Sequence, residues 1–177
     1  KNLLKKYSQS QVNKMSEKEK TKAFNEIWKN PIVSNAFEPG STYKPFTVAA
    51  GLEEGILKGN ETYYCDGYQK VGPHTIHCSH RSGHGLITLS QSISLSCNDA
   101  LMQIAAKEGK NVFARYQKNF NFGNKTGIDL PGEASSIMHQ KKNVGAVELA
   151  TMSFGQSIQI TPLQLLRAVS AVINGGK

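Results

Sequence analysis

A serine and a lysine three residues apart, Ser41 and Lys44, are the first candidates for chemistry in this sequence. At the start of a helix, residues i and i+3 share a face, so the lysine amine can reach the serine hydroxyl. A lysine activates a serine only when burial or charge lowers the lysine pKa. Helix N-terminal N–H groups would also stabilise an oxyanion. The pair predicts serine acyl transfer, while an N-cap serine beside a solvated lysine is the simpler alternative.

A second group of reactive residues lies between Cys65 and His84, where four of the five histidines stand close to two cysteines and an aspartate. Thiolate, imidazole and carboxylate are the ligands that zinc prefers. If metal is bound, we expect a structural role, because Ser41 and Lys44 already supply a nucleophile and a base. Exposed histidines with a Cys65–Cys78 disulfide are the alternative. The predicted pool, of which four members would bind zinc, is Asp66, His77, Cys78, His80 and His84.

Helices and one hairpin are expected to position these residues. An amphipathic helix over residues 16–30 begins at Ser16 as N-cap, and a turn at residues 38–40 precedes a helix over residues 41–57. Residues 62–78 are rich in β-branched and aromatic types around a Val-Gly-Pro break, which predicts a hairpin with its turn near residues 70–73. That register places Cys65 opposite Cys78 and Asp66 opposite His77. Further helices are predicted over residues 88–94, 99–107, 112–119 and 162–174.

The wider string EPGSTYKP at residues 38–45 resembles the nucleophile motif of penicillin-binding proteins. Other stretches are similar to the same family, and the resemblance covers residues 26–177. It is closest to monofunctional (class B) enzymes of Gram-positive bacteria, including the spore-cortex type. These other stretches are WKN at residues 28–30, GHG at 83–85, KTGIDLPGE at 125–133, SFGQ at 153–156 and TP at 161–162.

The resemblance implies an α+β fold of the penicillin-binding protein and serine β-lactamase type, present here mainly as its helical part with a β-hairpin insertion. It also identifies Ser96-Cys97-Asn98 as the second motif, located between two helices. In that role Ser96 relays a proton between Lys44 and the leaving group, and the Asn98 amide binds the substrate backbone. Helix capping is the alternative role for Ser96 and Asn98.

The family's third motif is Lys-Thr-Gly on a strand beside the active site. Residues 125–127 spell it, but we place them in a loop because they precede the family's IDLPGE stretch. We expect the true motif to follow the turn at residues 174–176, where the sequence ends. We therefore interpret residues 1–177 as a single partial transpeptidase domain. It consists of a basic N-terminal segment and helix over residues 1–30, followed by a catalytic region over residues 31–177 without its C-terminal strands.

The function implied is a peptidoglycan D,D-transpeptidase. Ser41 would attack the penultimate D-alanyl carbonyl of a stem peptide, and β-lactam antibiotics would acylate the same residue. No cofactor is needed for this chemistry. The resemblance also implies a cell-wall synthesis complex in the membrane, used in cell division or sporulation, on the extracytoplasmic face. The alternatives are a serine β-lactamase or β-lactam sensor, and a zinc-stabilised domain without activity.

Composition limits the remaining classes. The formal net charge is +8, and residues 1–30 hold eight lysines against three glutamates. This basic excess fits a solvated helix face or a surface near an anionic membrane or cell wall. No basic patch interleaved with aromatics and no zinc-finger spacing is present, so nucleic acid is not an expected partner. No stretch is apolar over the length of a membrane span, so we expect any anchor to lie outside this sequence.

Overall fold

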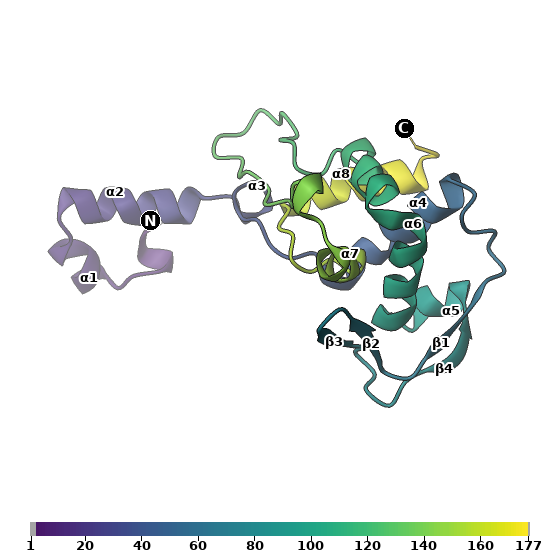
Figure 1. Ribbon diagram of the computed structural model, residues 1–177. Helices are drawn as coiled ribbons and strands as arrows, with labels where there is room; N and C mark the ends of the chain where they lie inside the picture. The colour runs from purple at the N-terminus through teal and green to yellow at the C-terminus, as the bar shows by residue number, and fades with distance from the viewer. Residues whose placement is uncertain (1–2, 177) are drawn as a thin grey trace.

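The chain folds into a helical body that carries two short antiparallel sheets, as the computed structural model of residues 3–176 shows (Figure 1). Short 3₁₀ turns occur at Leu3–Lys5, Gly40–Tyr43 and Lys141–Asn143. Within residues 3–176, none of the helices combines the length and the apolar character needed to cross a membrane. The α-helices are α1 (Gln9–Lys14), α2 (Glu17–Trp28), α3 (Pro31–Ser34), α4 (Lys44–Glu53), α5 (Leu89–Ser94), α6 (Asn98–Asn119), α7 (Ala146–Ser153) and α8 (Pro162–Ile173).

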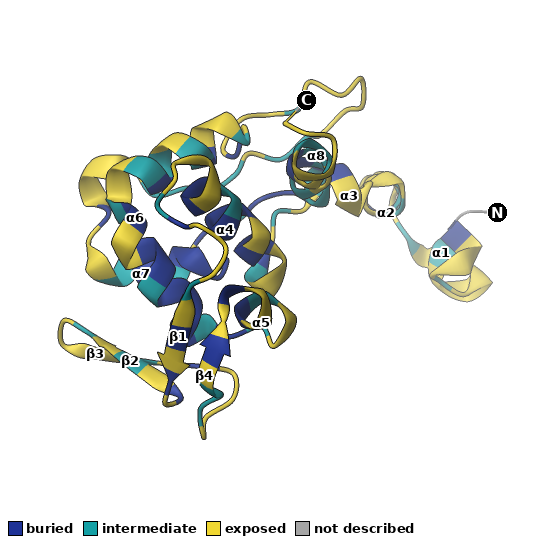
Figure 2. Cartoon of the chain, turned by 90° about the vertical axis from the view of Figure 1, so that its right-hand side faces the viewer, coloured by how far each residue is buried: buried dark blue, intermediate teal, exposed yellow. Residues whose placement is uncertain are grey.

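Helix α4, which begins at Lys44, is held between two hydrophobic clusters. Tyr43 and Phe46 pack with aromatic residues of α6 and the segment that follows it, in a cluster that α7 and α8 complete. Val48, on α4, belongs to a second cluster with residues of α5, α6 and the β1–β4 sheet. Figure 2 shows the buried residues of α4, α6 and α7 gathered in the interior of the body. Burial on both sides fixes the position of α4 and therefore of its first turn.

Local sequence signals account for several helix boundaries. Ser16, Thr88 and Thr161 each cap a helix through a reciprocal capping box, in which a glutamate or glutamine three residues later bonds back to the cap. The predicted break between residues 107 and 112 is confirmed. It is a kink inside α6 at Gly109, whose φ of 71° and ψ of 161° are not helical.

The two sheets divide the predicted hairpin into two parts. Strands β2 (Tyr68–Val71) and β3 (His74–His77) form a hairpin with its turn at residues 72–73, as predicted. Strand β1 (Thr62–Cys65) instead pairs with β4 (Gly85–Thr88), which places Cys65 opposite Gly85. The predicted pairings of Cys65 with Cys78 and of Asp66 with His77 are therefore wrong. Asp66 and Gly67 interrupt the first arm, so residues 62–65 are free to pair with a later strand.

Two other expectations need correction. The helix predicted over residues 41–57 begins with a 3₁₀ turn and ends at Glu53. Helix α2 forms as predicted, but of its apolar side only Ala23 is buried, and Trp28 is 64% exposed and stacked on Phe24. Helices α1 and α2 extend away from the body as an arm (Figure 1).

Candidate active site

Ser41 is exposed in a tight turn directly before α4. Gly40, the residue before it, has a φ of 56°, in the left-handed region that glycine adopts without strain. The 3₁₀ turn Gly40–Tyr43 then leads into α4 with no side chain capping its first residues. Tyr43 is only 2% exposed, so its side chain fixes the turn to the core, while Ser41 is exposed and directs its hydroxyl to the surface.

Lys44 is almost fully buried, with 1% of its surface exposed. Its Nζ donates hydrogen bonds to the carbonyl oxygen of Ser96 at 2.6 Å and to the Ser96 Oγ at 2.7 Å. Burial lowers the pKa of the Lys44 amine to about 8, while nearby Cys78 and Cys97 act in the opposite direction. A substantial fraction of this amine is therefore neutral near physiological pH and able to accept a proton.

Ser96 completes the cluster from a distant part of the chain. It lies between α5 and α6 with a φ of 52°, an uncommon conformation for a residue with a side chain. Its Oγ donates a hydrogen bond to the Ser41 Oγ at 2.9 Å. The structure thus brings the predicted residues Ser41, Lys44 and Ser96 together, with Ser96 bridging the other two. Asn98 is the first residue of α6, two positions after Ser96.

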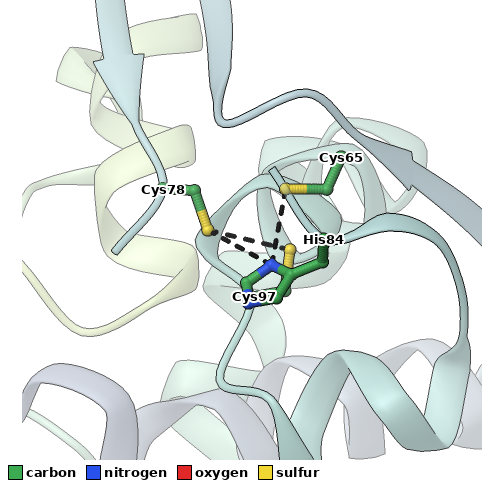
Figure 3. Close-up of side chains that lie close together, drawn as sticks. All are labelled: Cys65, Cys78, His84 and Cys97. Atoms are coloured by element: carbon green, nitrogen blue, oxygen red, sulfur yellow. Dashed lines mark hydrogen bonds between the residues drawn. The ribbon is translucent and has the colours of Figure 1, made fainter. Parts of the chain in front are cut away.

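Figure 3 shows a second cluster, of three thiols and one imidazole. It is next to the first, because Cys97 directly follows Ser96 in the chain. The four ligand atoms all lie within 4.8 Å of one another. The Cys78 and Cys97 sulfurs are 3.9 Å apart, and the His84 Nδ1 is 3.5 Å from the Cys65 sulfur and 3.8 Å from the Cys78 sulfur. All three cysteines are free thiols, so the alternative Cys65–Cys78 disulfide is not formed. We call Cys65, Cys78, His84 and Cys97 the thiol–imidazole cluster.

Close backbone contact allows this cluster to form. Gly83 has a φ of 79°, and an added Cβ would lie 2.3 Å from the Cys65 carbonyl oxygen. Only glycine permits such an approach, which brings His84 to the end of β1. Cys97 comes from the other side, as the N-cap of α6 whose sulfur accepts the Ala100 N–H. Three segments therefore meet at one point: the end of β1, the loop between β3 and β4, and the turn between α5 and α6.

Two members of the predicted ligand pool, Cys78 and His84, lie in the cluster, and three do not. His77 faces Tyr68 across the β2–β3 hairpin, and the His80 ring lies tilted beside that of His84 with ring centroids 5.0 Å apart. Asp66 follows β1 and is exposed. Sequence reasoning left Cys65 and Cys97 out of the pool, although thiolates are preferred zinc ligands and these are two of the chain's three cysteines.

The three thiols differ in how readily they ionise. Burial raises the pKa of Cys65 and of Cys97. Burial also acts on Cys78, but the backbone N–H groups of Asp99, His80 and Asn98 outweigh it and bring the pKa of Cys78 to about 7. Burial lowers the pKa of His84, which favours the neutral ring. A neutral imidazole and an easily ionised thiol are the forms that bind metal.

Comparison with known proteins identifies the family. The family described as the penicillin binding protein transpeptidase domain matches residues 6–177. The chain belongs to this family. The predicted fold is confirmed by solved transpeptidase domains. The apo domain of Burkholderia pseudomallei penicillin-binding protein 3 superposes with a TM-score of 0.77 at 28% identity, covering 81% of this chain and 43% of that one.

Curated relatives of this transpeptidase domain act in sporulation and in cell-wall synthesis, as their names state. Stage V sporulation protein D of Bacillus subtilis is 42% identical over 149 residues, covering 84% of this chain and 23% of that protein. Peptidoglycan D,D-transpeptidase FtsI of Escherichia coli K12 is 30% identical over 147 residues, covering 83% and 24%. The chain thus spans about a quarter of the length of these relatives.

A solved complex shows what one related structure binds. Penicillin-binding protein 3 of Mycobacterium tuberculosis complexed with ampicillin matches with a TM-score of 0.77 at 28% identity, covering 83% of this chain and 32% of that one.

Residues 125–127 of this chain, Lys-Thr-Gly, lie in a loop, where Thr126 donates hydrogen bonds to Glu133. The prediction that they lie in a loop is therefore confirmed.

Proposed function

We propose that this chain is the part of a peptidoglycan D,D-transpeptidase that carries the nucleophile Ser41 and its base Lys44. The observation that carries the proposal is the hydrogen-bonded series from Lys44 through Ser96 to Ser41. The lowered pKa of Lys44 supports it, because a buried amine that loses its proton near pH 8 can drive proton transfer. The family membership supplies the substrate class.

The proposed acylation begins with Lys44 as the free amine. The Ser41 proton passes to Ser96 as the Ser96 proton passes to Lys44, and the Ser41 oxygen forms a bond to the penultimate D-alanyl carbonyl carbon. Collapse of the tetrahedral intermediate breaks the peptide bond, and the departing D-alanine amine takes the proton back through Ser96. The amine of a neighbouring stem peptide then bonds to the acyl carbon, the ester bond to Ser41 breaks, and the proton lost by that amine returns to the Ser41 oxygen through Lys44 and Ser96. Asn98, at the start of α6, is proposed to bind the backbone of the stem peptide.

β-Lactam antibiotics are proposed to acylate the same serine, since their strained amide presents a carbonyl to Ser41 and the acyl group stays attached. The relative complexed with ampicillin supports this assignment. The proposed setting is a membrane-associated cell-wall synthesis complex on the extracytoplasmic face. Sporulation is the favoured role, because the sporulation protein of B. subtilis shares more identity with this chain than FtsI of E. coli does.

The experiment is intact-mass spectrometry after incubation with a fluorescent penicillin. The wild-type chain gains the mass of one penicilloyl group, Ser41→Ala gains none, and the control Ser34→Ala, a serine on α3, behaves as wild type. Absence of an adduct on wild type would contradict the proposal. Rapid turnover of a chromogenic cephalosporin with no lasting adduct would favour the β-lactamase alternative.

We further propose that the thiol–imidazole cluster binds one Zn²⁺ in a structural role. Three thiolates and one imidazole form one of the usual ligand sets of structural zinc sites. A tetrahedral site with Zn–S bonds of about 2.3 Å and Zn–N bonds of about 2.0 Å requires sulfur–sulfur separations of roughly 3.8 Å and sulfur–nitrogen separations of roughly 3.5 Å. The cluster has 3.9 Å between the Cys78 and Cys97 sulfurs, and 3.5 Å and 3.8 Å between His84 and two sulfurs.

Zinc at this position would connect the insertion to the active site. Cys97 lies between Ser96 and Asn98, so a metal bound to its sulfur would hold the turn that carries both residues. Cys65, Cys78 and His84 would tie the strands and the following loop to the same turn. The metal would have no catalytic step, because all four ligands come from the protein and leave no open position.

The test is the metal content of purified protein, measured by inductively coupled plasma mass spectrometry. We expect about one zinc per chain, lost in Cys97→Ala and retained in His77→Ala and Asp66→Ala, which remove residues outside the cluster. Substitution by Co²⁺ should give the absorption of a tetrahedral thiolate site. Zinc content that is unchanged in Cys97→Ala, or absent from wild type, would contradict this proposal and leave the transpeptidase proposal standing.

A further inference from the structure

The turn that carries Ser41 is held by backbone hydrogen bonds to a segment distant in the sequence, residues 153–160. Phe37 and Ile160 exchange two backbone hydrogen bonds of 3.0 Å, and the Gly40 N–H donates to the Gly155 carbonyl at 2.9 Å. Gly155 fits so closely that an added Cβ would lie 2.2 Å from the Gly40 carbonyl oxygen. Residues 153–160 therefore form a brace for the nucleophile turn at residues 37–43.

One side chain joins the turn to the brace. The Ser157 N–H donates a hydrogen bond of 2.9 Å to the Glu38 Oε1. In the part of the chain that the structure describes, this is the only side-chain hydrogen bond between residues 37–43 and residues 153–160. Glu38 stands three residues before Ser41, and the 3₁₀ turn that contains Ser41, Gly40–Tyr43, has no side-chain cap of its own.

The residue that Glu38 holds is in a strained conformation. Ser157 has a φ of 61°, a left-handed geometry that residues other than glycine avoid. Its side chain is fixed on the other side, since its Oγ lies 2.9 Å from the Thr151 Oγ1 at the end of α7. A carboxylate that accepts the Ser157 N–H favours this geometry, because a charge-assisted hydrogen bond is stronger than the bond to water it replaces.

We propose that Glu38 is a positioning residue for acyl transfer, which fixes the turn carrying Ser41 by holding the backbone of Ser157 in the brace. Glu38 acts through the backbone and does not touch the reacting atoms. The proposal rests on the proposed function of Ser41 as nucleophile. Removing the carboxylate frees the Ser157 backbone, loosens the Gly40–Gly155 contact and spreads Ser41 over several orientations, so acylation slows although Ser41, Lys44 and Ser96 are all present.

The experiment compares Glu38→Ala, Glu38→Gln and Glu26→Ala, each as the full chain, by penicillin acylation rate and by amide hydrogen exchange. The Gln variant keeps an oxygen acceptor and loses only the charge, while Glu26 is an exposed glutamate on the distant α2. We expect Glu38→Ala to acylate about tenfold more slowly and its Ser157 and Gly40 amides to exchange about tenfold faster. Glu38→Gln should recover most of both values, and Glu26→Ala should match wild type.

Unchanged exchange at Ser157 and Gly40 in Glu38→Ala would overturn the proposal. So would faster exchange with an unchanged acylation rate, because the contact would then have no effect on Ser41. If the Gln variant keeps the slow exchange of wild type at Ser157 and Gly40 yet acylates as slowly as the Ala variant, the charge of Glu38 affects acylation without holding the turn, and the positioning role is wrong. If wild type forms no adduct, the proposed function fails, and the exchange rates still decide whether Glu38 holds the turn.

Discussion

The cluster of Ser41, Lys44 and Ser96 and the thiol–imidazole cluster share one turn, yet they are built in different ways. Ser41 and Lys44 come from one helical turn, and Ser96 joins them from a single distant turn. The thiol–imidazole cluster draws its four residues from three segments. Ser96 and Cys97 are consecutive, so each cluster fixes one side of the same turn. A local pair can thus be recognised from spacing, while a site assembled from three segments cannot.

The largest expected effect is the loss of acylation rate when Lys44 is removed, because Lys44 belongs to the cluster that contains Ser41 and not to the thiol–imidazole cluster. Lys44→Ala should slow penicillin acylation by about a thousandfold, because it removes the base. In wild type the acylation rate should rise with pH through about 8 and then level off, since the pKa of Lys44 is about 8 and only the neutral amine accepts a proton. Stopped-flow fluorescence from pH 6 to 9.5 measures this, with the exposed Lys58→Ala as control. A rate independent of pH would show that Lys44 is not the base.

The second effect tests whether the neighbouring cluster supports the first. Removing zinc with a chelator should lower the free energy of unfolding by about 3 kcal/mol, the linkage expected when free metal exceeds its dissociation constant by a few hundredfold. The rate of penicillin acylation should fall as well, because the turn that carries Ser96 is no longer held by a metal bond to Cys97. Thermal melts with and without chelator measure the stability. Cys97→Ser should melt low in both conditions, whereas a chelator effect that survives in Cys97→Ser would place the metal elsewhere.

The smallest effect concerns Glu108, a buried acid that belongs to neither cluster. Lys44 is buried with two hydrogen-bond partners, but neither carboxyl oxygen of Glu108 has one, and burial raises its pKa to about 8. The folded state holds this proton and the unfolded state releases it above about pH 4.5. Stability therefore falls as pH rises from about 4.5 to about 8.

Glu108→Gln should remove this dependence. At pH 8 the variant should be more stable than wild type by about 2 kcal/mol, a partial gain because the buried amide also lacks a partner. Near pH 4.5 the variant should instead be less stable than wild type by about 2 kcal/mol, because the buried amide lacks partners at every pH while wild type then holds its proton at no cost. Urea unfolding at both pH values measures the difference, with the exposed Glu53→Gln as control. A constant difference across pH would show that Glu108 is ionised in the folded protein.

Sequence was sufficient where the information is local. Ser41 and Lys44 are three residues apart in a helical turn, and Ser16 sits at the start of α2 with its capping partner Glu19 three residues later. The kink at Gly109 also follows from the local pattern. These features depend on neighbours within one helical turn, which periodicity and capping rules describe.

Sequence was insufficient where pairing is long-range. The arm that includes Cys65 pairs with β4, twenty or more residues later, and the short hairpin register could not reveal it. Cys97 reaches the other thiols only because it caps α6 at the point where the loop after β3 packs. The role of Glu38 likewise depends on Ser157, which is 119 residues away in the sequence.

The most direct test of the central claim is to locate the covalent attachment of penicillin. Cys78, with a pKa near 7, is the competing nucleophile close to Lys44, so an adduct on the intact chain does not by itself identify Ser41. Tryptic digestion and tandem mass spectrometry of the penicillin-treated chain distinguish the two residues. The account predicts the penicilloyl group on Ser41 and unmodified Cys78. Attachment at Cys78, or at any residue other than Ser41, would contradict it.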